Sequence, residues 1–354
     1  MKALIDIGHP AHVHFFRNPI QRLIEHGHEV TITSRDKEFA LDLLDNLGLQ
    51  HHPLSALKKG GILSLGKELI YRDYALLKIA RKIKPDIMAG IGGVFIAHVG
   101  KLTGIPSLAF YDTENATLQN MITYPFASAV VVPACYETWV PKNRHLRYHG
   151  YHELSYLHPD YFTPDKQKAI ENGLAKNGDT FFLRLVSWQA NHDIGENGWS
   201  TELLKRVVSK LSERGKVVIS SESELPKELA NYRYRGKVEE AHHLMAYCRA
   251  FIGESATMAS ECAVLGVPSI YAAETGRGYT NEQERRYGLV RNLKELSWDR
   301  LNTIIDELLS KPVEYWQEKR TDLLNDTIDV AAFVTECIET FPKPLEAYQK
   351  TVFQ

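Results

Sequence analysis

The sequence predicts an α/β protein made of two doubly wound, Rossmann-like domains that face each other across a cleft. Apolar strand patterns alternate with helical patterns along the chain, which favours parallel sheets joined by right-handed crossovers. A turn, a helix and a Gly-x-Pro-Ser stop occur twice, at residues 92–107 and 253–269, in the same order and at similar spacing. The 354 residues also suffice for two ordinary domains with substantial cores.

Composition and charge exclude several classes of protein. The net charge of -2 gives no electrostatic basis for binding nucleic acid. No apolar run reaches membrane-spanning length, and the first residues enter a strand directly, so neither a membrane anchor nor a signal peptide is expected. The cysteines are widely separated and form no Cys-x-x-Cys pair, which is typical of reduced core residues in a cytoplasmic protein. They are Cys135, Cys248, Cys262 and Cys337.

In the first half, each expected strand leads into a helix that a glycine or a proline ends. The first helix should carry Phe16 and Ile20 and end at Gly27, with Pro19 near its start because proline lacks the N–H that a helix interior needs. Strands are expected at 3–7, 30–33, 86–89, 108–111 and 129–132, and further helices at 38–47, 63–83 and 94–102.

In the second half, the alternation begins again after a stretch without clear periodicity. Residues 147–166 are expected to cross between the domains, and Ser200 to cap a helix. Strands are expected at 180–188 and 217–220, polar loops at 189–199 and 274–285, and helices at 241–248, 297–309 and 313–341. The expected division is 1–160 for the N-terminal domain, 161–340 for the C-terminal domain, and 341–354 for a tail that packs back on the N-terminal domain.

Residues 251–271 carry the strongest sign of a ligand site. The pattern predicts a strand, a tight turn of small residues, a helix that buries Met258, Cys262 and Leu265, and a second strand after Pro268. An open helix N-terminus favours an anion, so the N–H groups of Ser255, Ala256 and Thr257 are candidates for binding a diphosphate. Glu261 follows one turn after Thr257 and suits a ribose hydroxyl pair. The alternative is an ordinary strand–turn–helix unit that binds nothing.

Other polar residues stand at places where ligands collect in open parallel sheets. Arg184 lies in an otherwise apolar strand, and it should either reach an anion or form a salt bridge to a nearby carboxylate. Glu114 follows a strand end and either serves the site or caps a helix. His9, His12 and His14, together with Asp6, have a spacing that can bind zinc, which leaves a metal hydrolase as a remote alternative.

Four separate patches resemble one family of enzymes. They are Ala11-His12-Val13 with His26-Gly27-His28-Glu29-Val30, Gly104-Ile105-Pro106 with Thr113-Glu114-Asn115-Ala116, the stretch 251–271, and Asn281-Glu282-Gln283. On these residues the chain resembles the GT-B glycosyltransferases, and it is similar over its whole length to a domain-of-unknown-function family labelled predicted glycosyltransferase. Within that group it resembles the N-acetylglucosaminyltransferase that makes lipid II and the UDP-N-acetylglucosamine 2-epimerases. The turn Gly8-His9-Pro10-Ala11 departs from the glycine run of the lipid II enzyme.

The resemblance implies a nucleotide-sugar enzyme, with an acceptor-side N-terminal domain and a donor-side C-terminal domain. It implies that Glu261 holds the ribose, that Asn281, Glu282 and Gln283 contact the donor sugar, that Lys237 and Val238 hold the base through backbone atoms, and that His192 contacts phosphate. His12 is the expected catalytic base, with His9 as the alternative, and Glu114 positions the acceptor or shares the proton. Their alternative role is to cap a helix. No cofactor or metal is expected, since the nucleotide-sugar is a substrate.

The expected reaction is metal-independent transfer of a sugar, from a UDP donor by resemblance, to a glycan or lipid-linked acceptor of cell-envelope polysaccharide synthesis. A 2-epimerase is the main alternative, and a non-catalytic sugar-nucleotide sensor is another. Peripheral membrane contact is a further hypothesis, because apolar and basic residues occur together in two segments. Those residues are Phe15, Phe16, Arg17, Lys58, Lys59, Ile62 and Leu63.

Overall fold

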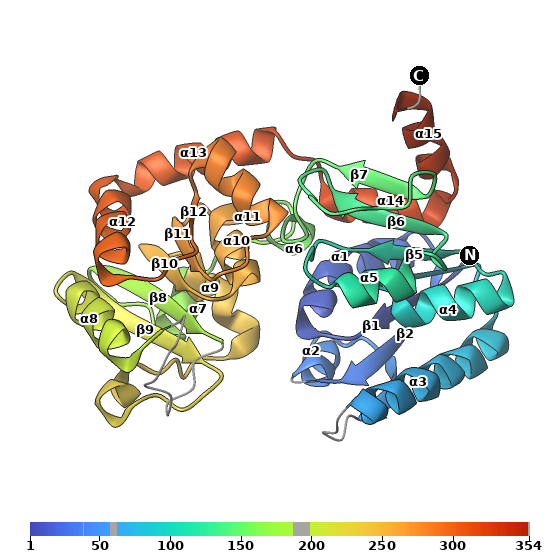
Figure 1. Cartoon of the computed structure of the whole chain (residues 1–354), viewed down its shortest axis with the longest axis horizontal. Helices are drawn as coiled ribbons and strands as arrows, with labels where there is room; N and C mark the ends of the chain where they lie inside the picture. The colour runs from blue at the N-terminus through green and yellow to red at the C-terminus, as the bar shows by residue number, and fades with distance from the viewer. Residues whose placement is uncertain (38, 57–61, 187–198, 353–354) are drawn as a thin grey trace. The chain divides into compact units, whose positions relative to one another are not determined.

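The computed structural model describes residues 1–37, 39–56, 62–186 and 199–352 and divides into two compact units. Unit 1 comprises Met1–Tyr156 and Ile328–Gln354, and unit 2 comprises Leu157–Thr327 (Figure 1). Each unit contains one parallel sheet with helices packed against it. The predicted α/β class with two Rossmann-like sheets is therefore confirmed.

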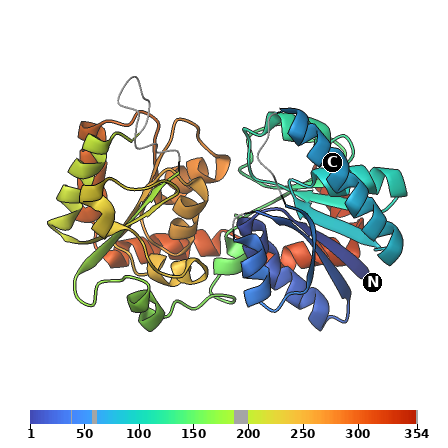
Figure 2. The same ribbon diagram turned by 90° about the horizontal axis from the view of Figure 1, so that it is seen from below.

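Unit 1 is built on a sheet of strand order β3-β2-β1-β4-β5-β6-β7, in which all neighbours pair in parallel. Helices α1, α2 and α14 pack together on one face, and α3, α4 and α5 on the other (Figure 2). The strands are β1 Lys2–Ile7, β2 Glu29–Asp36, β3 His51–Ala56, β4 Ile87–Ile91, β5 Ser107–Phe110, β6 Ala129–Pro133 and β7 His145–Tyr148. The helices are α1 Pro10–Glu25, α2 Ala40–Asn46, α3 Ile62–Ile83, α4 Val94–Thr103, α5 Thr117–Thr123, α6 Leu154–Leu157, α14 Val330–Thr340 and α15 Lys343–Val352.

Unit 2 is built on a sheet of strand order β12-β11-β10-β8-β9, which is also parallel throughout. Its strands are β8 Asp179–Leu185, β9 Gly215–Ser221, β10 Ala250–Gly253, β11 Ser269–Ala272 and β12 Val290–Leu293. Its helices are α7 Lys166–Glu171, α8 Thr201–Ser212, α9 Ala241–Met245, α10 Ala256–Val264, α11 Gly278–Glu282, α12 Trp298–Ser310 and α13 Val313–Asn325. The short helices η1 Lys227–Tyr232, η2 Val238–Glu240 and η3 Gln283–Tyr287 complete it.

The strand orders define a switch point in each sheet, where successive connections leave in opposite directions. In unit 1 the switch lies between β1 and β4, and in unit 2 it lies between β8 and β10. Ligands of open α/β sheets bind beyond the carboxyl ends of the strands at such points. The switch points therefore single out the segments that follow β1 and β4 in unit 1 and β8 and β10 in unit 2.

Helix α1 contains a proline in its interior, where a position near the start was expected. Pro19 has no N–H to donate to the carbonyl of Phe15, four residues back. The hydroxyl of Ser155 donates to that carbonyl instead, at 2.6 Å, and the Asn18 side chain donates to the Ser155 carbonyl at 2.7 Å. Helix α6 thus docks onto the gap that the proline makes in α1.

Several helix ends follow the expected chemistry. The Ser200 hydroxyl caps α8 by accepting from Leu203 N, as predicted. Helix α4 begins after Gly93 and ends at Gly104, both in the left-handed conformation that glycine adopts without strain. In α10, Cys262 and Leu265 are buried as expected, while Met258 is only partly buried.

Other segments differ from the expectation. The polar stretch 274–285 holds the helical segment α11–η3, and the helix expected at 313–341 is two helices, α13 and α14. Helix α14 belongs to unit 1, although the sequence placed residues up to 340 in the second domain. The reason is its packing: Val330 and Val334 are fully buried, and Glu339 accepts hydrogen bonds from His26 and His28 beside α1.

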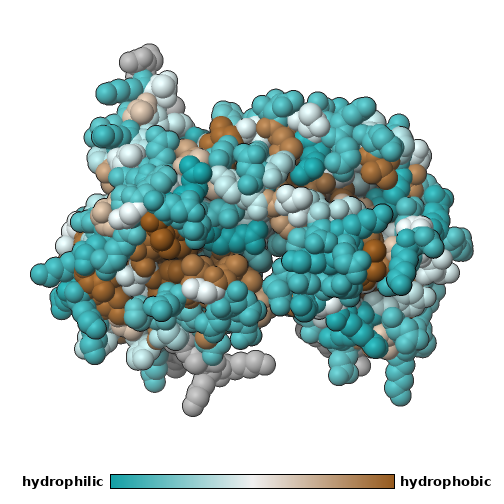
Figure 3. Space-filling model, turned by 180° about the vertical axis from the view of Figure 1, so that it is seen from behind, coloured by the Kyte–Doolittle hydropathy of each residue, from teal (hydrophilic) through white to brown (hydrophobic). Residues whose placement is uncertain are grey.

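Of the seven residues named from the sequence for membrane contact, Phe15, Phe16 and Arg17 have side chains that the structure describes. Phe15 and Phe16 are fully buried core residues, which corrects that expectation, and Arg17 donates to the Tyr156 carbonyl. Lys58 and Lys59 lie outside the described residues. Seen from behind, the surface is mostly hydrophilic, with apolar residues gathered on part of unit 1 (Figure 3). Among the helices of the described residues, none is both long and apolar enough to span a bilayer.

Candidate functional site

The carboxyl edge of the unit 2 sheet is closely packed at its switch point. A Cβ atom on Gly253, at the end of β10, would overlap the backbone carbonyl oxygen of Arg184 in β8. One residue on, the Glu254 carboxylate accepts a hydrogen bond from Val186 N at 2.6 Å. The close approach of the two strands therefore requires a glycine at position 253. The hydrogen bond from Val186 N to the Glu254 carboxylate joins the segments that follow the same two strands.

Helix α10 begins at this edge. The Ser255 hydroxyl accepts from Met258 N at 3.3 Å and so satisfies one of the N–H groups that a helix start leaves open. Ser255 and Thr257 are partly exposed, whereas Ala256 is buried. Small residues therefore lie at the start of α10, as expected for a helix N-terminus that binds an anion.

Glu261 lies farther along α10 and is buried against a histidine. Its carboxylate is 2.9 Å from the Nε2 atom of His242 in α9, and both side chains are less than a tenth exposed. A buried carboxylate needs a partner of this kind. The histidine, which the sequence did not single out, fixes the orientation of the carboxylate predicted to hold a ribose.

Arg184 pairs with a carboxylate, which was one of its two expected roles. Its guanidinium donates to the Ser220 hydroxyl at 2.9 Å and to the Glu222 carboxylate at 2.6 Å. Its charge is therefore already matched, and an anion would have to compete with Glu222. His192, the other predicted phosphate contact, falls in 187–198 and lies outside the described residues.

The backbone of Lys237 is held by two side chains of unit 2. Lys237 N donates to the Asn172 side chain at 2.7 Å, and the Tyr234 hydroxyl donates to the Lys237 carbonyl at 2.8 Å. Both backbone groups of Lys237 are thus used within the protein, which argues against Lys237 as the residue that reads a base. Val238 follows at the start of η2 with its side chain about half exposed, at 47%.

The three residues predicted to contact a donor sugar differ in environment. Gln283 is fully buried, and its amide donates to Ser260 of α10 at 2.8 Å, so it braces η3 against the helix. Glu282 lies 3.8 Å from Arg286, and Asn281 packs beside Gly276. Asn281 and Glu282 are partly exposed, which leaves them better placed than Gln283 to meet a ligand.

In unit 1, two of the predicted histidines lie together after β1. The Nδ1 atom of His9 accepts from Ala11 N at 3.2 Å and caps α1, which is the alternative role for a histidine here. The Nδ1 atom of His12 accepts from Gly8 N at 3.2 Å, and the two rings are 5.9 Å apart. Burial lowers the pKa of His12 to about 3, with His9 and His152 acting in the same direction.

These contacts favour His12 as a hydrogen-bond donor over the catalytic base that the sequence predicts. A neutral imidazole that accepts at Nδ1 carries its proton on Nε2. The Nε2 atom of His12 therefore presents an N–H group and has no lone pair with which to take a proton.

The structure brings together a histidine and an aspartate that the sequence did not pair. Asp112 follows β5, His152 follows β7, and the Asp112 carboxylate lies 3.1 Å from the Nδ1 atom of His152. Burial by itself raises the pKa of Asp112, but the His152 ring and hydrogen bonds from His152 and Thr113 hold it below its usual value. Recognising β7 in the sequence would have revealed the pair, because the carboxyl ends of parallel strands share one edge.

Two other acidic residues of unit 1 that the sequence singled out, Glu114 and Asp6, have partners within the fold. Glu114 accepts from Glu137 N at 3.5 Å beyond β5. Asp6 lies 3.4 Å from Arg72 and accepts from the Thr33 hydroxyl at 2.8 Å, and burial raises its pKa against those two partners. Arg72 and Thr33 therefore hold the Asp6 carboxylate in place.

The proposed zinc residues do not converge. His14 stacks on Tyr156 with ring centroids 5.2 Å apart, Asp6 pairs with Arg72, and His9 caps its helix. Within the described residues, no three His, Cys, Asp or Glu side chains are arranged to hold a metal ion. The geometry gives the metal hydrolase no ligand set.

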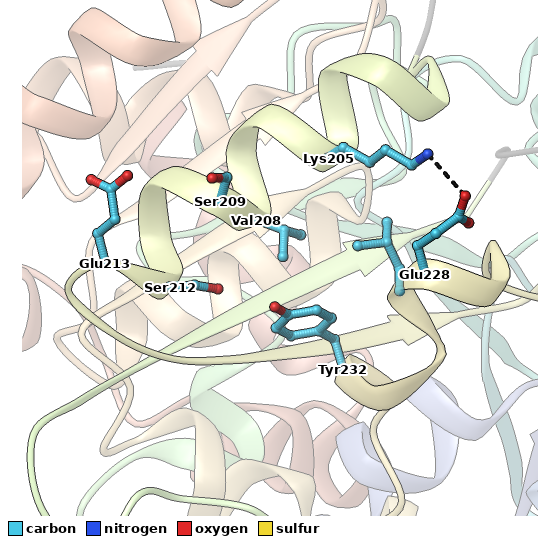
Figure 4. A pocket seen from close by; sticks show the side chains of 8 residues that line it. Lys205, Val208, Ser209, Ser212, Glu213, Glu228 and Tyr232 are labelled. Carbon is cyan, nitrogen blue, oxygen red and sulfur yellow. Dashed lines mark hydrogen bonds and ion pairs between the residues drawn. The ribbon is translucent and has the colours of Figure 1, made fainter.

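A separate pocket of about 430 Å³ lies on unit 2 between α8 and η1 (Figure 4). Its floor is apolar, formed by Val208 and Leu229, and Lys205 crosses its rim to Glu228 at 3.3 Å. It extends along α8 to Ser212 at the helix C-terminus, which in a parallel sheet points away from the edge where α10 begins. The pocket is therefore not part of the candidate site.

Known proteins with a similar sequence or a similar structure support the architecture of two parallel sheets. An uncharacterized protein of Methanocaldococcus jannaschii is 23% identical over 280 residues, which cover 75% of this chain and 80% of that protein. UDP-GlcNAc 2-epimerase from Neisseria meningitidis, solved with UDP-GlcNAc bound, has a TM-score of 0.68 at 14% identity over 95% of this chain and 99% of its own. Acinetobacter baumannii MurG has a TM-score of 0.61 at 13% identity over 96% and 99%.

These structural likenesses establish the shared two-domain, Rossmann-like GT-B fold and nothing about the reaction. The family model described as Protein of unknown function (DUF354) matches residues 1–330, most of the chain. This protein therefore belongs to the DUF354 family.

Proposed function

We propose that this protein is a glycosyltransferase that moves a sugar from a nucleoside-diphosphate donor, preferably UDP-linked, to a glycan or lipid-linked acceptor without a bound metal. The observation that carries the proposal is the start of α10 at the switch point of the unit 2 sheet. A helix N-terminus at such a point favours a pyrophosphate through its N–H groups and dipole. The epimerase of the same fold was solved with UDP-GlcNAc bound, which supports the same ligand class.

In this proposal, unit 2 binds the donor. The diphosphate lies on the N–H groups at Ser255, Ala256 and Thr257, and Glu261, oriented by His242, accepts from the ribose hydroxyls. Asn281 and Glu282 contact the sugar, and Gln283 supports them by bracing η3 on α10. The base is held near Val238 at the start of η2, four residues before His242.

Unit 1 supplies the acid–base chemistry. Transfer to a hydroxyl requires a group that takes its proton, and the carboxyl edge of the unit 1 sheet concentrates titratable side chains around the ends of β1, β5 and β7. Within this edge, His12 donates a hydrogen bond from Nε2 and Glu114 orients the acceptor.

A thermal-shift screen of nucleoside diphosphates tests the donor site. UDP at one hundred times its Kd should stabilise the native state by about 2.7 kcal/mol, and the shift should persist in EDTA. Glu261→Gln should weaken UDP about tenfold, since it removes a charged acceptor worth about 1.4 kcal/mol. Glu213→Gln, at an exposed end of α8, is the matched control and should bind like the wild type.

A chain that no nucleoside diphosphate stabilises would contradict the proposal. If EDTA abolishes the stabilisation by UDP, the protein binds the nucleotide but needs a metal ion to do so. Equal UDP affinity in Glu261→Gln and the wild type would show that Glu261 does not bind the ribose.

A UDP-GlcNAc 2-epimerase is the second candidate. The specific observation in its favour is the fold, since an epimerase has the higher TM-score of the two solved structures compared above. Asp112 and Glu114 also provide carboxylates beyond β5, which elimination chemistry needs. Incubation with UDP-GlcNAc alone, followed by NMR for the manno epimer, separates the two: an epimerase forms it without an acceptor and a transferase does not.

A further inference from the structure

The Asp112–His152 pair leaves one ring nitrogen of the histidine without a hydrogen bond. His152 is only 7% exposed, and its Nε2 atom is buried with no partner among the described residues. An unpartnered buried polar atom costs stability, and each one in a folded protein calls for an explanation. A role in binding or catalysis is one such explanation.

The partner of the other nitrogen fixes where the proton sits. The Asp112 carboxylate lies 3.1 Å from Nδ1 of His152 and accepts from the Thr113 hydroxyl at 3.1 Å. An ionised carboxylate only accepts hydrogen bonds, so Nδ1 of His152 carries a proton. In the neutral ring, Nε2 then holds a lone pair, as in the histidine of a proton-accepting His–Asp pair.

The surroundings hold His152 in place. Its ring packs on Phe15 of α1 with centroids 4.4 Å apart. The Ser155 hydroxyl anchors the same segment to the Phe15 carbonyl, at the gap left by Pro19. His12 lies one turn before Phe15 on α1, so both histidines are near the same face of that helix. His152 is thus held in a fixed position near His12, and both His12 and Asp112 are partly exposed.

A second His–Asp pair in unit 1 shows what a purely structural pair looks like. The Nδ1 atom of His98 lies 2.8 Å from Asp73, and its Nε2 atom lies 2.9 Å from the Ile122 carbonyl. Both nitrogens face acceptors, so both donate, and the hydrogen bond to Asp73 raises the pKa of His98 against the effect of burial. His98 has no lone pair to offer, whereas His152 has one.

We propose that His152 is the proton acceptor of the reaction, that Asp112 is its positioning carboxylate, and that His12 donates a hydrogen bond to the same ligand oxygen. This inference rests on the proposed function. The acceptor hydroxyl enters beside Asp112 and His12 and donates to Nε2 of His152. As its oxygen bonds to the anomeric carbon, its proton passes to Nε2, and the bond from that carbon to the diphosphate oxygen breaks with its electron pair on the departing nucleoside diphosphate. The resulting imidazolium is stabilised by Asp112.

Histidine ¹⁵N NMR on the full chain tests the proton positions directly. Long-range ¹H–¹⁵N spectra should show His152 protonated on Nδ1 and His12 on Nε2, with His98 protonated on both nitrogens. His152→Gln, His12→Gln and His98→Gln assign the signals by their loss. A His152 ring with its proton on Nε2 alone overturns the inference, whatever the activity.

Donor turnover with UDP-GlcNAc tests the role. His152→Gln should lower kcat at least about 100-fold, the range of general base catalysis, while UDP still raises the melting temperature as in the wild type. Asp112→Asn should lower kcat by a smaller factor, since the amide oxygen still accepts from Nδ1 but does not stabilise the imidazolium. His98→Gln is the matched control and should keep the wild-type kcat.

The outcomes separate the two proposals. A wild type stabilised by UDP whose His152→Gln variant turns over at the wild-type rate overturns the inference alone. A wild type that no nucleoside diphosphate stabilises overturns the proposed function, and the inference falls with it.

Discussion

The two sheets have the same architecture, but the carboxyl edges at their switch points differ in chemistry. In unit 1 the edge is made of side chains that hold protons: His9, His12, Asp112 and His152. In unit 2 the edge is made of backbone, with the strands in close contact at Gly253 and α10 starting beside it. Backbone donors suit a ligand group of constant shape and charge, such as a phosphate, while titratable side chains suit a group whose proton changes. One architecture thus suits two kinds of ligand chemistry.

The largest expected difference between the edges concerns their glycines. Gly253→Ala should destabilise the protein by about 3 kcal/mol or more, because the new Cβ overlaps the Arg184 carbonyl and also lies 2.9 Å from Arg184 N. Gly8→Ala, after β1, should change stability by less than about 1 kcal/mol, because its nearest contact is the His12 side chain at 3.7 Å. Urea unfolding of both variants measures the difference.

Equal costs for the two alanines would break the comparison, since the unit 2 edge would then be no more tightly packed than the unit 1 edge. Circular dichroism of Gly253→Ala in the absence of urea shows whether the variant is folded enough for its free energy of unfolding to be measured.

The next effect is acid sensitivity that originates in unit 1. His12 has a folded pKa of about 3 against 6.5 when unfolded, so between these values the unfolded chain binds the proton and the native chain does not. Stability from this group is therefore complete above pH 6.5 and falls as the pH drops. At pH 5 the loss is about 2 kcal/mol.

His12→Gln removes this term, so the variant should lose about 2 kcal/mol less than the wild type between pH 7 and pH 5. Urea unfolding at both pH values measures it. Parallel losses in the two proteins would mean that His12 titrates in the native state near its ordinary pKa.

A smaller effect tests how His152 is held. Ser155→Ala should cost about 1.5 kcal/mol, because the Phe15 carbonyl loses the donor that replaces the missing N–H of Pro19. In a Pro19→Ala background the helix N–H returns, and the same change at Ser155 should cost less by about 1 kcal/mol. A double-mutant cycle in urea gives the coupling. Additive losses would show that the serine and the proline act independently.

Periodicity in the sequence was enough to predict the α/β class and most strands, since buried parallel strands are short apolar runs. It missed β3, where His51-His52-Pro53 reads as polar and irregular, and it missed β7 and β12, which have only 4 residues each. It also placed Pro19 by local rules, because no local signal shows that a serine far along the chain replaces its hydrogen bond.

The candidate site was predictable in unit 2 and less so in unit 1 for the same reason. Ser255, Thr257 and Glu261 belong to one continuous helix, whose spacing can be read directly. Asp112 and His152 follow different strands, and their pairing depends on which strands are neighbours in the sheet. The partners of Arg184, Lys237 and Glu261 likewise come from other elements and have no signal in the sequence around them.

The smallest expected effect tests whether backbone N–H groups at the start of α10 bind the diphosphate. Ser255→Ala removes the cap of α10 and should cost about 1 kcal/mol, as should Ser200→Ala, which removes the equivalent cap of α8. If a diphosphate lies on the start of α10, its oxygens accept hydrogen bonds from the same N–H groups. The melting-temperature gap between Ser255→Ala and the wild type should then narrow in saturating UDP, while the gap for Ser200→Ala should stay constant. If the melting-temperature gap stays constant for both variants, the diphosphate does not reach the N-terminus of α10. The nucleotide site of unit 2 would then have to lie elsewhere along its sheet.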